Sequence, residues 1–225
     1  QRHYDEAEKL YRRTLAIWEK ASVPEHGKVE TVLSGLAGCL NHQGNYDKAE
    51  PLYQRLLAMQ EKALVPEESE VATTLRKLAA CSKRQGTHGG AEPLYRRSLA
   101  LFEKTLGPEH PEVATSLSKL AKLLESQGDH AEAEALYRRA LLVNEKALGP
   151  DNSAGLKVIN NLANLLKTQG NYDKAVPLYR RALSIEENAL GRDHEDVGTT
   201  LVNLATLLES QGDYTEAGLL FKRSL

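Results

Sequence analysis

The fold of this chain is decided by residues 113–150, which read VATSLSKLAKLLESQGDHAEAEALYRRALLVNEKALGP. Its first half places apolar residues on one face of an amphipathic helix, at Val113, Leu117, Leu120, Ala121 and Leu124. After the turn at Gly128, a second stretch from Ala133 to Leu141 has the same spacing. Glycine suits a helix end because it accepts positive φ, and Pro150 cannot continue a helix. The stretch therefore predicts a first helix, helix A, ending before Gly128, and a second, helix B, ending before Gly149.

The same pattern recurs every 42 residues along the chain, as the dipeptide Leu-Ala shows at 36, 78, 120, 162 and 204. Strand-like alternation is absent, so the sequence predicts an all-α protein. One helix pair of this size cannot bury its apolar stripe, whereas stacked neighbours form a continuous core. We expect a single array over 1–225, with a partial repeat at 1–22, full repeats at 29–64, 71–106, 113–148 and 155–190, and a truncated repeat at 197–225. Neither end resembles a polar cap, which predicts a fragment of a longer chain.

Helix B carries three recurring features that lead to local predictions. Prolines inside it, each lacking an amide donor, predict a late start or a slight bend at Pro51, Pro93 and Pro177. The Arg-Arg pairs predict weak salt bridges to glutamates of neighbouring repeats. One position varies strongly, which predicts exposure, and holds Trp18, Gln60, Phe102, Asn144 and Glu186. Packing is the alternative for Phe102, and burial under a preceding repeat is the alternative for Trp18.

Composition excludes several classes of protein. The chain has 29 Lys+Arg against 31 Asp+Glu, a net charge of −2, and 5% aromatic residues, so we expect no nucleic-acid partner. Its longest aliphatic run, residues 140–143, is far shorter than the roughly 18 residues of a membrane-spanning helix, so we expect no membrane insertion. Cys39 and Cys81 form no CxxC pair, are expected to be small core residues, and fit a reducing compartment. We expect a soluble, cytoplasmic protein.

No recognisable catalytic motif is present. The patterns GxxxxGK[ST], GxGxxG, HExxH and GxSxG are all missing from the sequence. The histidines His26, His110 and His194 occupy equivalent loops in different repeats, too far apart to share one ion. The sequence therefore predicts a protein that is not an enzyme and that holds no cofactor and no metal.

The helix pair resembles the tetratricopeptide repeat, with small residues at the helix crossing (Ala121, Gly128, Ala133) and Tyr137 in the second helix. Residues 106–114, 133–141 and 159–163 look like the 42-residue form found in kinesin light chains, nephrocystin-type ciliary proteins and many microbial arrays coupled to nucleotide-hydrolysing domains. The resemblance implies a right-handed superhelical solenoid of antiparallel helix pairs. It also implies that helix A lines a concave face that holds a peptide of a partner protein.

A candidate binding surface lies on helix A opposite the apolar stripe, as a turn of 100° per residue places it. Its candidate residues are Lys77, Arg84, Lys119, Lys122, Asn161, Asn164 and Asn203, with Arg76 at the edge. The cations would form a basic strip suited to an acidic peptide. The resemblance implies that Asn161 and Asn203 hydrogen-bond a peptide backbone, and that the peptide carries a Trp or another large apolar residue as an anchor. Lys77 and Lys119 replace this asparagine in two repeats, and Gly35 replaces it in another.

These features support two hypotheses about function. The first is a non-catalytic scaffold for protein–protein interaction that binds an acidic peptide, as a cargo adaptor does. The alternative is a regulatory or sensor array attached to a nucleotide-hydrolysing domain of the NB-ARC type. Self-association through exposed end repeats is a further possibility.

Overall fold

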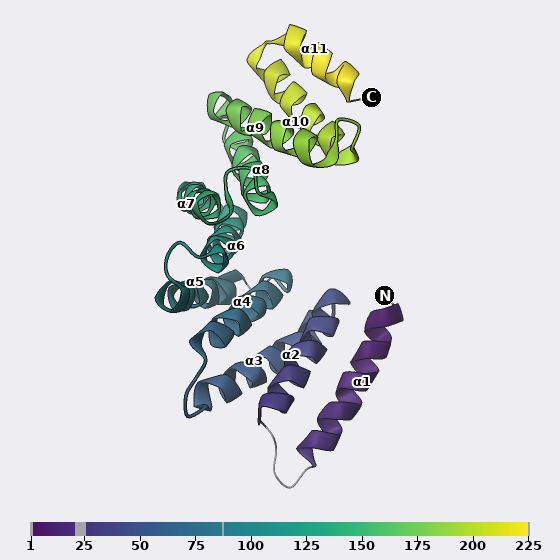
Figure 1. Ribbon diagram of the computed structural model, residues 1–225, viewed down its shortest axis with the longest axis vertical. Coiled ribbons are helices and arrows are strands. Elements are labelled where there is room, and N and C mark those ends of the chain that lie inside the picture. Colours follow the sequence, from purple (N-terminus) through teal and green to yellow (C-terminus); the bar gives the residue numbers. More distant parts are fainter. Residues whose placement is uncertain (1, 21–25, 87, 225) are drawn as a thin grey trace. The chain divides into compact units, whose positions relative to one another are not determined.

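The structure is a computed structural model that describes residues 2–20, 26–86 and 88–224. Over these residues the chain forms eleven α-helices and no strand (Figure 1), so the all-α prediction is confirmed. The helices are α1 (Arg2–Glu19), α2 (His26–His42), α3 (Tyr46–Lys62), α4 (Glu68–Arg84), α5 (His88–Leu106), α6 (Pro111–Gln127), α7 (His130–Leu148), α8 (Ser153–Thr168), α9 (Tyr172–Leu190), α10 (Glu195–Gln211) and α11 (Tyr214–Arg223). Even-numbered helices are the predicted A helices, and odd-numbered helices are the B helices.

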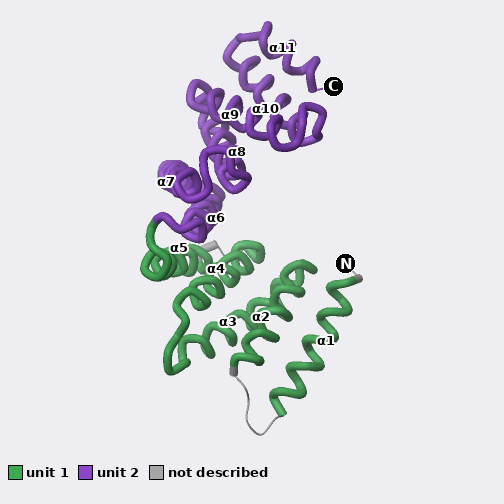
Figure 2. Tube along the Cα trace, viewed as in Figure 1, with its two compact units in different colours: residues 1–108 green, residues 109–225 purple. Residues whose placement is uncertain are grey.

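The chain divides into two compact units, Gln1–Pro108 and Glu109–Leu225 (Figure 2). Unit 1 contains α1 to α5, and unit 2 contains α6 to α11. Within each unit every helix packs against the next helix along the chain. The predicted packing of consecutive helix pairs is therefore confirmed in both units.

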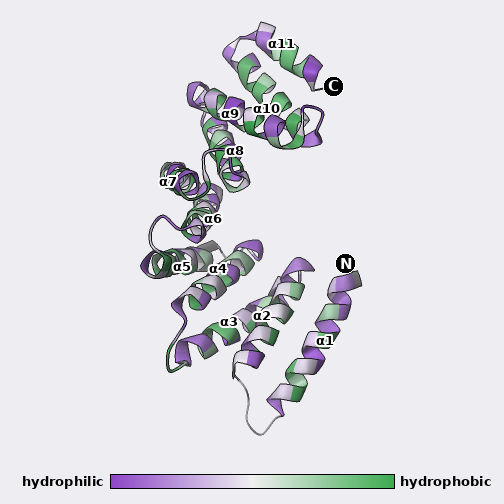
Figure 3. Cartoon of the chain, viewed as in Figure 1, coloured by the Kyte–Doolittle hydropathy of each residue, from purple (hydrophilic) through white to green (hydrophobic). Residues whose placement is uncertain are grey.

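The core of each unit consists of small and aliphatic residues from both helices of each pair, together with tyrosines from the B helices. The Leu-Ala dipeptides are buried in each of the five A helices. Equivalent tyrosines of the B helices expose at most 2% of their surface, at Tyr53, Tyr95, Tyr137 and Tyr179. Figure 3 shows the resulting pattern, in which hydrophobic and hydrophilic residues alternate around each helix. Cys39 and Cys81 are free and buried, as expected of small core residues.

The helix ends are set by the residues that the sequence placed there. Gly128 ends α6 with φ 89°, in the left-handed region that glycine adopts without strain. Pro111 lies in the first turn of α6, where its missing amide costs nothing. His110 caps the same helix, because its Nδ1 accepts a hydrogen bond from the backbone N–H of Glu112 at 3.2 Å.

The prolines of helix B do not delay the helix. Helix α3 begins at Tyr46 and runs through Pro51, and α5 and α9 likewise include Pro93 and Pro177. Of the two predicted effects, the late start is therefore wrong, and the slight bend stays a prediction. Ala49 and Tyr53 are buried on either side of Pro51, so packing of the first turns offsets the lost hydrogen bond.

The variable position of helix B is buried in four of its five residues, so the predicted exposure is wrong there, and the packing alternative for Phe102 is confirmed. The fifth residue, Trp18, is half-buried. Gln60, Phe102, Asn144 and Glu186 expose only 8%, 2%, 3% and 4% of their surface. Two of them contact helix A of their own pair. Asn160 Nδ2 donates to Glu186 Oε1 at 3.3 Å, and the Arg76 guanidinium lies 5.0 Å from the centre of the Phe102 ring. In these two repeats the buried residue and its helix A partner both differ from the residues at the same positions of the other repeats.

Helix α3 ends earlier in its repeat than α5, α7 and α9 do. Helix α3 ends at Lys62, whereas the full repeat was expected to extend to residue 64. Val65 stands where later repeats have glycines with φ 87°, at Gly107, Gly149 and Gly191. A β-branched residue does not adopt that conformation, so the chain leaves the helix earlier. As a result, Leu64 and Val65 project into solvent.

Salt bridges connect neighbouring B helices within each unit. The arginine of one B helix reaches a glutamate 36 residues earlier, in the pairs Arg55–Glu19, Arg97–Glu61, Arg181–Glu145 and Arg223–Glu187. These pairs confirm the predicted bridges between repeats. Each is partly exposed and stabilises the fold by about 0.2–1 kcal/mol.

Candidate peptide-binding surface

The surface of each A helix opposite its apolar stripe is open, as the sequence predicts. In α6 its residues Thr115, Lys119, Lys122 and Ser126 are all exposed. At the equivalent positions of the other four A helices, no residue is buried. We call these positions the open face. Among the predicted site residues, α4 of unit 1 carries Arg76, Lys77 and Arg84, and unit 2 carries Lys119 and Lys122 on α6, Asn161 and Asn164 on α8, and Asn203 on α10.

Lys77 is fixed against the neighbouring A helix. Its Nζ donates to the hydroxyl of Ser34 on α2 at 3.1 Å. The side chain is half-buried, and its desolvation, together with the charge of Arg76, lowers the pKa of Lys77 below the ordinary value for lysine. Lys77 therefore extends across unit 1 toward α2 and does not project freely into solvent.

The two candidate arginines of unit 1, Arg76 and Arg84, contact aromatic rings. Arg84 lies 5.6 Å from the centre of the Tyr46 ring and donates to the Tyr46 hydroxyl at 3.0 Å. Arg76 packs on Phe102 of α5 and so turns toward helix B. Sequence analysis did not predict the contact with Tyr46. The signal was the repeat spacing, because Tyr4 and His42 occupy the equivalent positions one period earlier. Those two rings also contact each other, with their centres 5.1 Å apart.

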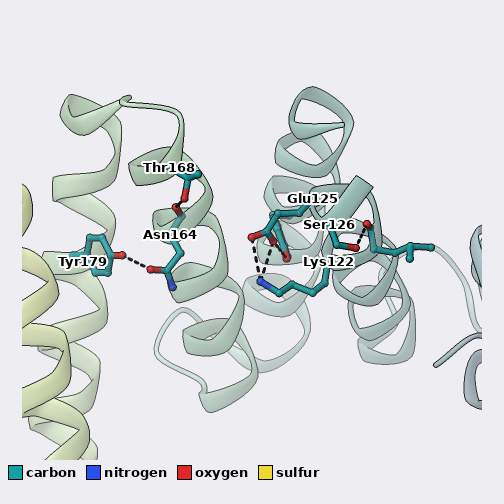
Figure 4. Close-up of polar contacts among 8 residues, drawn as sticks. Lys122, Glu125, Ser126, Asn164, Thr168 and Tyr179 are labelled. Atoms are coloured by element: carbon teal, nitrogen blue, oxygen red, sulfur yellow. Dashed lines mark hydrogen bonds and ion pairs between the residues drawn. The ribbon is translucent and has the colours of Figure 1, made fainter. Parts of the chain in front are cut away.

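In unit 2, a carboxylate and a tyrosine accompany Lys122. Its Nζ donates to both carboxylate oxygens of Glu125, at 3.1 and 3.2 Å (Figure 4). The hydroxyl of Tyr137, which comes from α7, donates to Glu125 Oε2 at 2.9 Å. Glu125 therefore offsets the charge of Lys122, which sequence analysis had counted as part of a basic strip. Its position three residues after Lys122 was the available signal.

Asn164 is held in a similar way on the next A helix. The Tyr179 hydroxyl, from α9, lies 2.6 Å from Asn164 Oδ1 (Figure 4). Tyr179 is only 1% exposed, and its burial raises the pKa of Tyr179 to about 12. Asn164 itself is exposed on the open face.

One row of polar side chains is left without a partner. Lys119, Asn161 and Asn203 occupy the same repeat position on α6, α8 and α10 of unit 2. Lys119 is exposed, and the two asparagines are half-buried. Within the described part of the chain, none of the three side chains makes a hydrogen bond or an ion pair. These groups can meet a ligand without first breaking a contact.

A hollow adjoins this row at α10 and the end of α11. It measures about 530 Å³, and its lining includes Asn203, His194 and Arg192. No three His, Cys, Asp or Glu side chains among residues 2–20, 26–86 and 88–224 are placed to hold a metal ion. No helix in those ranges is long and apolar enough to cross a membrane.

Consecutive helix pairs with an open face on every first helix define a helical-repeat protein. The sequence matches the tetratricopeptide repeat family over residues 1–62, 70–154 and 156–225, so the chain belongs to that family. This match confirms the resemblance seen in the sequence. It indicates a repeat scaffold of a kind that is generally non-catalytic and that binds other proteins.

Solved structures support the same fold. BtubC (BKLC) from P. vanneervenii has a TM-score of 0.85 at 23% identity, over 98% of this chain and 89% of that chain. Repeats of a putative kinesin light chain from Podosopora anserina have a TM-score of 0.77 at 23% identity, over 90% and 95%. MamA has a TM-score of 0.62 at 17% identity, over 84% and 92%. Comparison with curated protein sequences found no match.

Proposed function

We propose that this chain is a non-catalytic, cytoplasmic scaffold that binds an acidic peptide segment of a partner protein on its open face. The observation that carries the proposal is the row Lys119, Asn161 and Asn203. These three side chains share one register on consecutive A helices and have no partner among the described residues. A side-chain amide both donates and accepts, so two of them in register suit the alternating groups of a peptide backbone.

The charge on the open face favours an acidic ligand. Lys77 and Arg84 contact the neutral groups of Ser34 and Tyr46, so no carboxylate offsets their charge in those contacts. Lys119 adds an exposed cation in unit 2. Such charges attract an acidic peptide and speed its first encounter with the surface. Amide hydrogen bonds and burial of one or two apolar anchor residues then hold it.

Fluorescence anisotropy titration tests the proposal directly. One labelled peptide carries a Trp flanked by acidic residues, and the control peptide has basic residues in their place. We expect only the acidic peptide to bind, and more weakly at the higher of two salt concentrations. Binding of both peptides, or of neither, would contradict the proposal.

Charge-reversal variants locate the contact. Lys77→Glu combined with Lys119→Glu should weaken binding of the acidic peptide at least about tenfold and reduce its salt dependence. Lys174→Glu is the matched control for Lys119→Glu alone, because each reverses one exposed lysine of unit 2 and Lys174 lies on helix B, away from the open face. An equal loss in the control would assign the effect to overall charge. Unchanged affinity of the double variant would show that Lys77 and Lys119 do not contact the peptide.

A further inference from the structure

Tyr179 reaches from the core of unit 2 to a side chain of the open face. Its ring is buried in the α8–α9 pair, while its hydroxyl lies 2.6 Å from Asn164 Oδ1 (Figure 4). Hydrogen bonds from O–H to oxygen span about 2.5–3.0 Å, whereas those from N–H to oxygen begin at about 2.7 Å. The short separation therefore indicates that Tyr179 donates and that the amide oxygen of Asn164 accepts.

This contact decides what Asn164 can offer to a ligand. A side-chain amide has one acceptor oxygen and two N–H donors. Since the hydroxyl of Tyr179 engages the oxygen, the Nδ2 group is turned away from it. Asn164 Nδ2 makes no hydrogen bond to any residue that the structure describes. Asn164 therefore presents donors, whereas Asn161 and Asn203 lack such a contact and can present either group.

In the preceding repeat the equivalent tyrosine also makes a polar contact, with a different partner. Lys122 occupies the position equivalent to Asn164, and Tyr137 the position equivalent to Tyr179. Tyr137 donates to Glu125, and Glu125 accepts from Lys122 Nζ. There the tyrosine supports a carboxylate that engages Lys122, whereas in the α8–α9 pair it engages the amide oxygen of Asn164 and leaves the Nδ2 group without a partner among the described residues.

We propose that Tyr179 is a positioning residue that makes Asn164 a donor-only contact for a carbonyl or carboxylate oxygen of the bound peptide. This inference rests on the proposed function and specifies the chemistry of one contact within it. Its ligand is the same acidic peptide, and its distinguishing feature is the direction of the hydrogen bond at Asn164.

Four variants test this direction with the labelled acidic peptide. Tyr179→Phe removes only the hydroxyl and should weaken binding about threefold, and Asn164→Ala about fivefold. Asn164→Asp should weaken it at least about tenfold, because the carboxylate accepts from Tyr179 and then opposes the ligand oxygen. Combining Tyr179→Phe with Asn164→Ala should cost no more than Asn164→Ala alone, since the tyrosine acts through the amide.

Tyr53→Phe is the matched control. Tyr53 has the same repeat position in α3 and is 1% exposed, and its hydroxyl makes no hydrogen bond among the described residues. Its substitution should change affinity less than about twofold. Unchanged binding by Tyr179→Phe, additive losses in the double variant, or an Asn164→Asp variant no weaker than Asn164→Ala would each overturn the inference.

A measurement without ligand separates this inference from the proposed function. In the free protein, the side-chain amide signals of Asn164 in nitrogen-15 NMR should shift and become more mobile in Tyr179→Phe but not in Tyr53→Phe. Unaltered signals would overturn the positioning role. If the wild-type protein bound no acidic peptide, the proposed function and the ligand part of this inference would both fail, and the NMR result would decide the positioning role by itself.

Discussion

Two glycines of helix α2 predict opposite outcomes for the same substitution. Gly35 and Gly38 both lie inside α2, where alanine is favoured over glycine by about 1 kcal/mol. At Gly38 an added Cβ would meet no atom within 4 Å. Gly38→Ala should therefore raise the free energy of unfolding by about 1 kcal/mol.

At Gly35 the same methyl group meets the ring of Tyr11. The added Cβ would lie 2.5 Å from Tyr11 Cζ and 2.7 Å from Tyr11 Cε1, so the ring must move. Tyr11 packs against the core cluster of unit 1 and joins α1 to α2. Overpacking of this kind costs about 1–3 kcal/mol, which offsets the gain in helix propensity. Gly35→Ala should thus be about 1–3 kcal/mol less stable than Gly38→Ala.

Urea unfolding followed by circular dichroism measures this difference. The same two substitutions in a Tyr11→Ala background supply the control, because the ring is then absent. In that background Gly35→Ala should also stabilise by about 1 kcal/mol. Equal stability of the two variants in the wild-type background would refute the reasoning, and so would a penalty at Gly35 that persists without the tyrosine ring.

Two further predictions concern a helix cap and the buried tyrosines. His110→Ala should lower the free energy of unfolding by about 1 kcal/mol, while His110→Asn should retain it, as Asn152 caps α8 at the equivalent place; denaturant unfolding checks both. Burial raises to about 12 the pKa of Tyr53, Tyr95 and Tyr179. In the unfolded chain the tyrosine pKa is about 10. The free energy of unfolding should therefore be unaffected by tyrosine ionisation below about pH 10 and should fall between about pH 10 and pH 12. Tyrosinate absorbance tests this, and ionisation of all tyrosines in one step near 10 in the folded protein would contradict it.

The sequence alone predicted most of the fold because its determinants are local and repeated. The 42-residue period, the apolar stripes and the glycines at helix ends each act within one helix pair. The burial of Glu186 was not predicted, because variation between repeats was taken to indicate exposure. Helix B packs against helix A of its own pair as well as against the next repeat. A residue that varies between repeats can therefore still be buried when its partner, here Asn160, varies with it.

The open face was predicted correctly in position, but its contacts were not. Helical periodicity states which way a residue points, whereas the conformation of a long side chain depends on neighbours far along the chain. Lys77 donates a hydrogen bond to Ser34, which lies 43 residues earlier in the sequence. Arg84 donates one to Tyr46, which lies 38 residues earlier. The contact between the Tyr179 hydroxyl and Asn164 could not be predicted either, because it depends on how deeply the tyrosine ring is buried.

The salt bridges between B helices have a consequence for how such a gene can change in length. Four of these bridges join an arginine to a glutamate of the preceding repeat, and Arg180 bridges Glu216 of the following repeat. Neighbouring repeats therefore each supply one partner of a bridge. The variable buried pairs, such as Asn160 and Glu186, are contained within a single helix pair. Recombination that duplicates or deletes one whole period therefore keeps both kinds of contact intact. A crossover within a period would instead separate a buried residue from its partner.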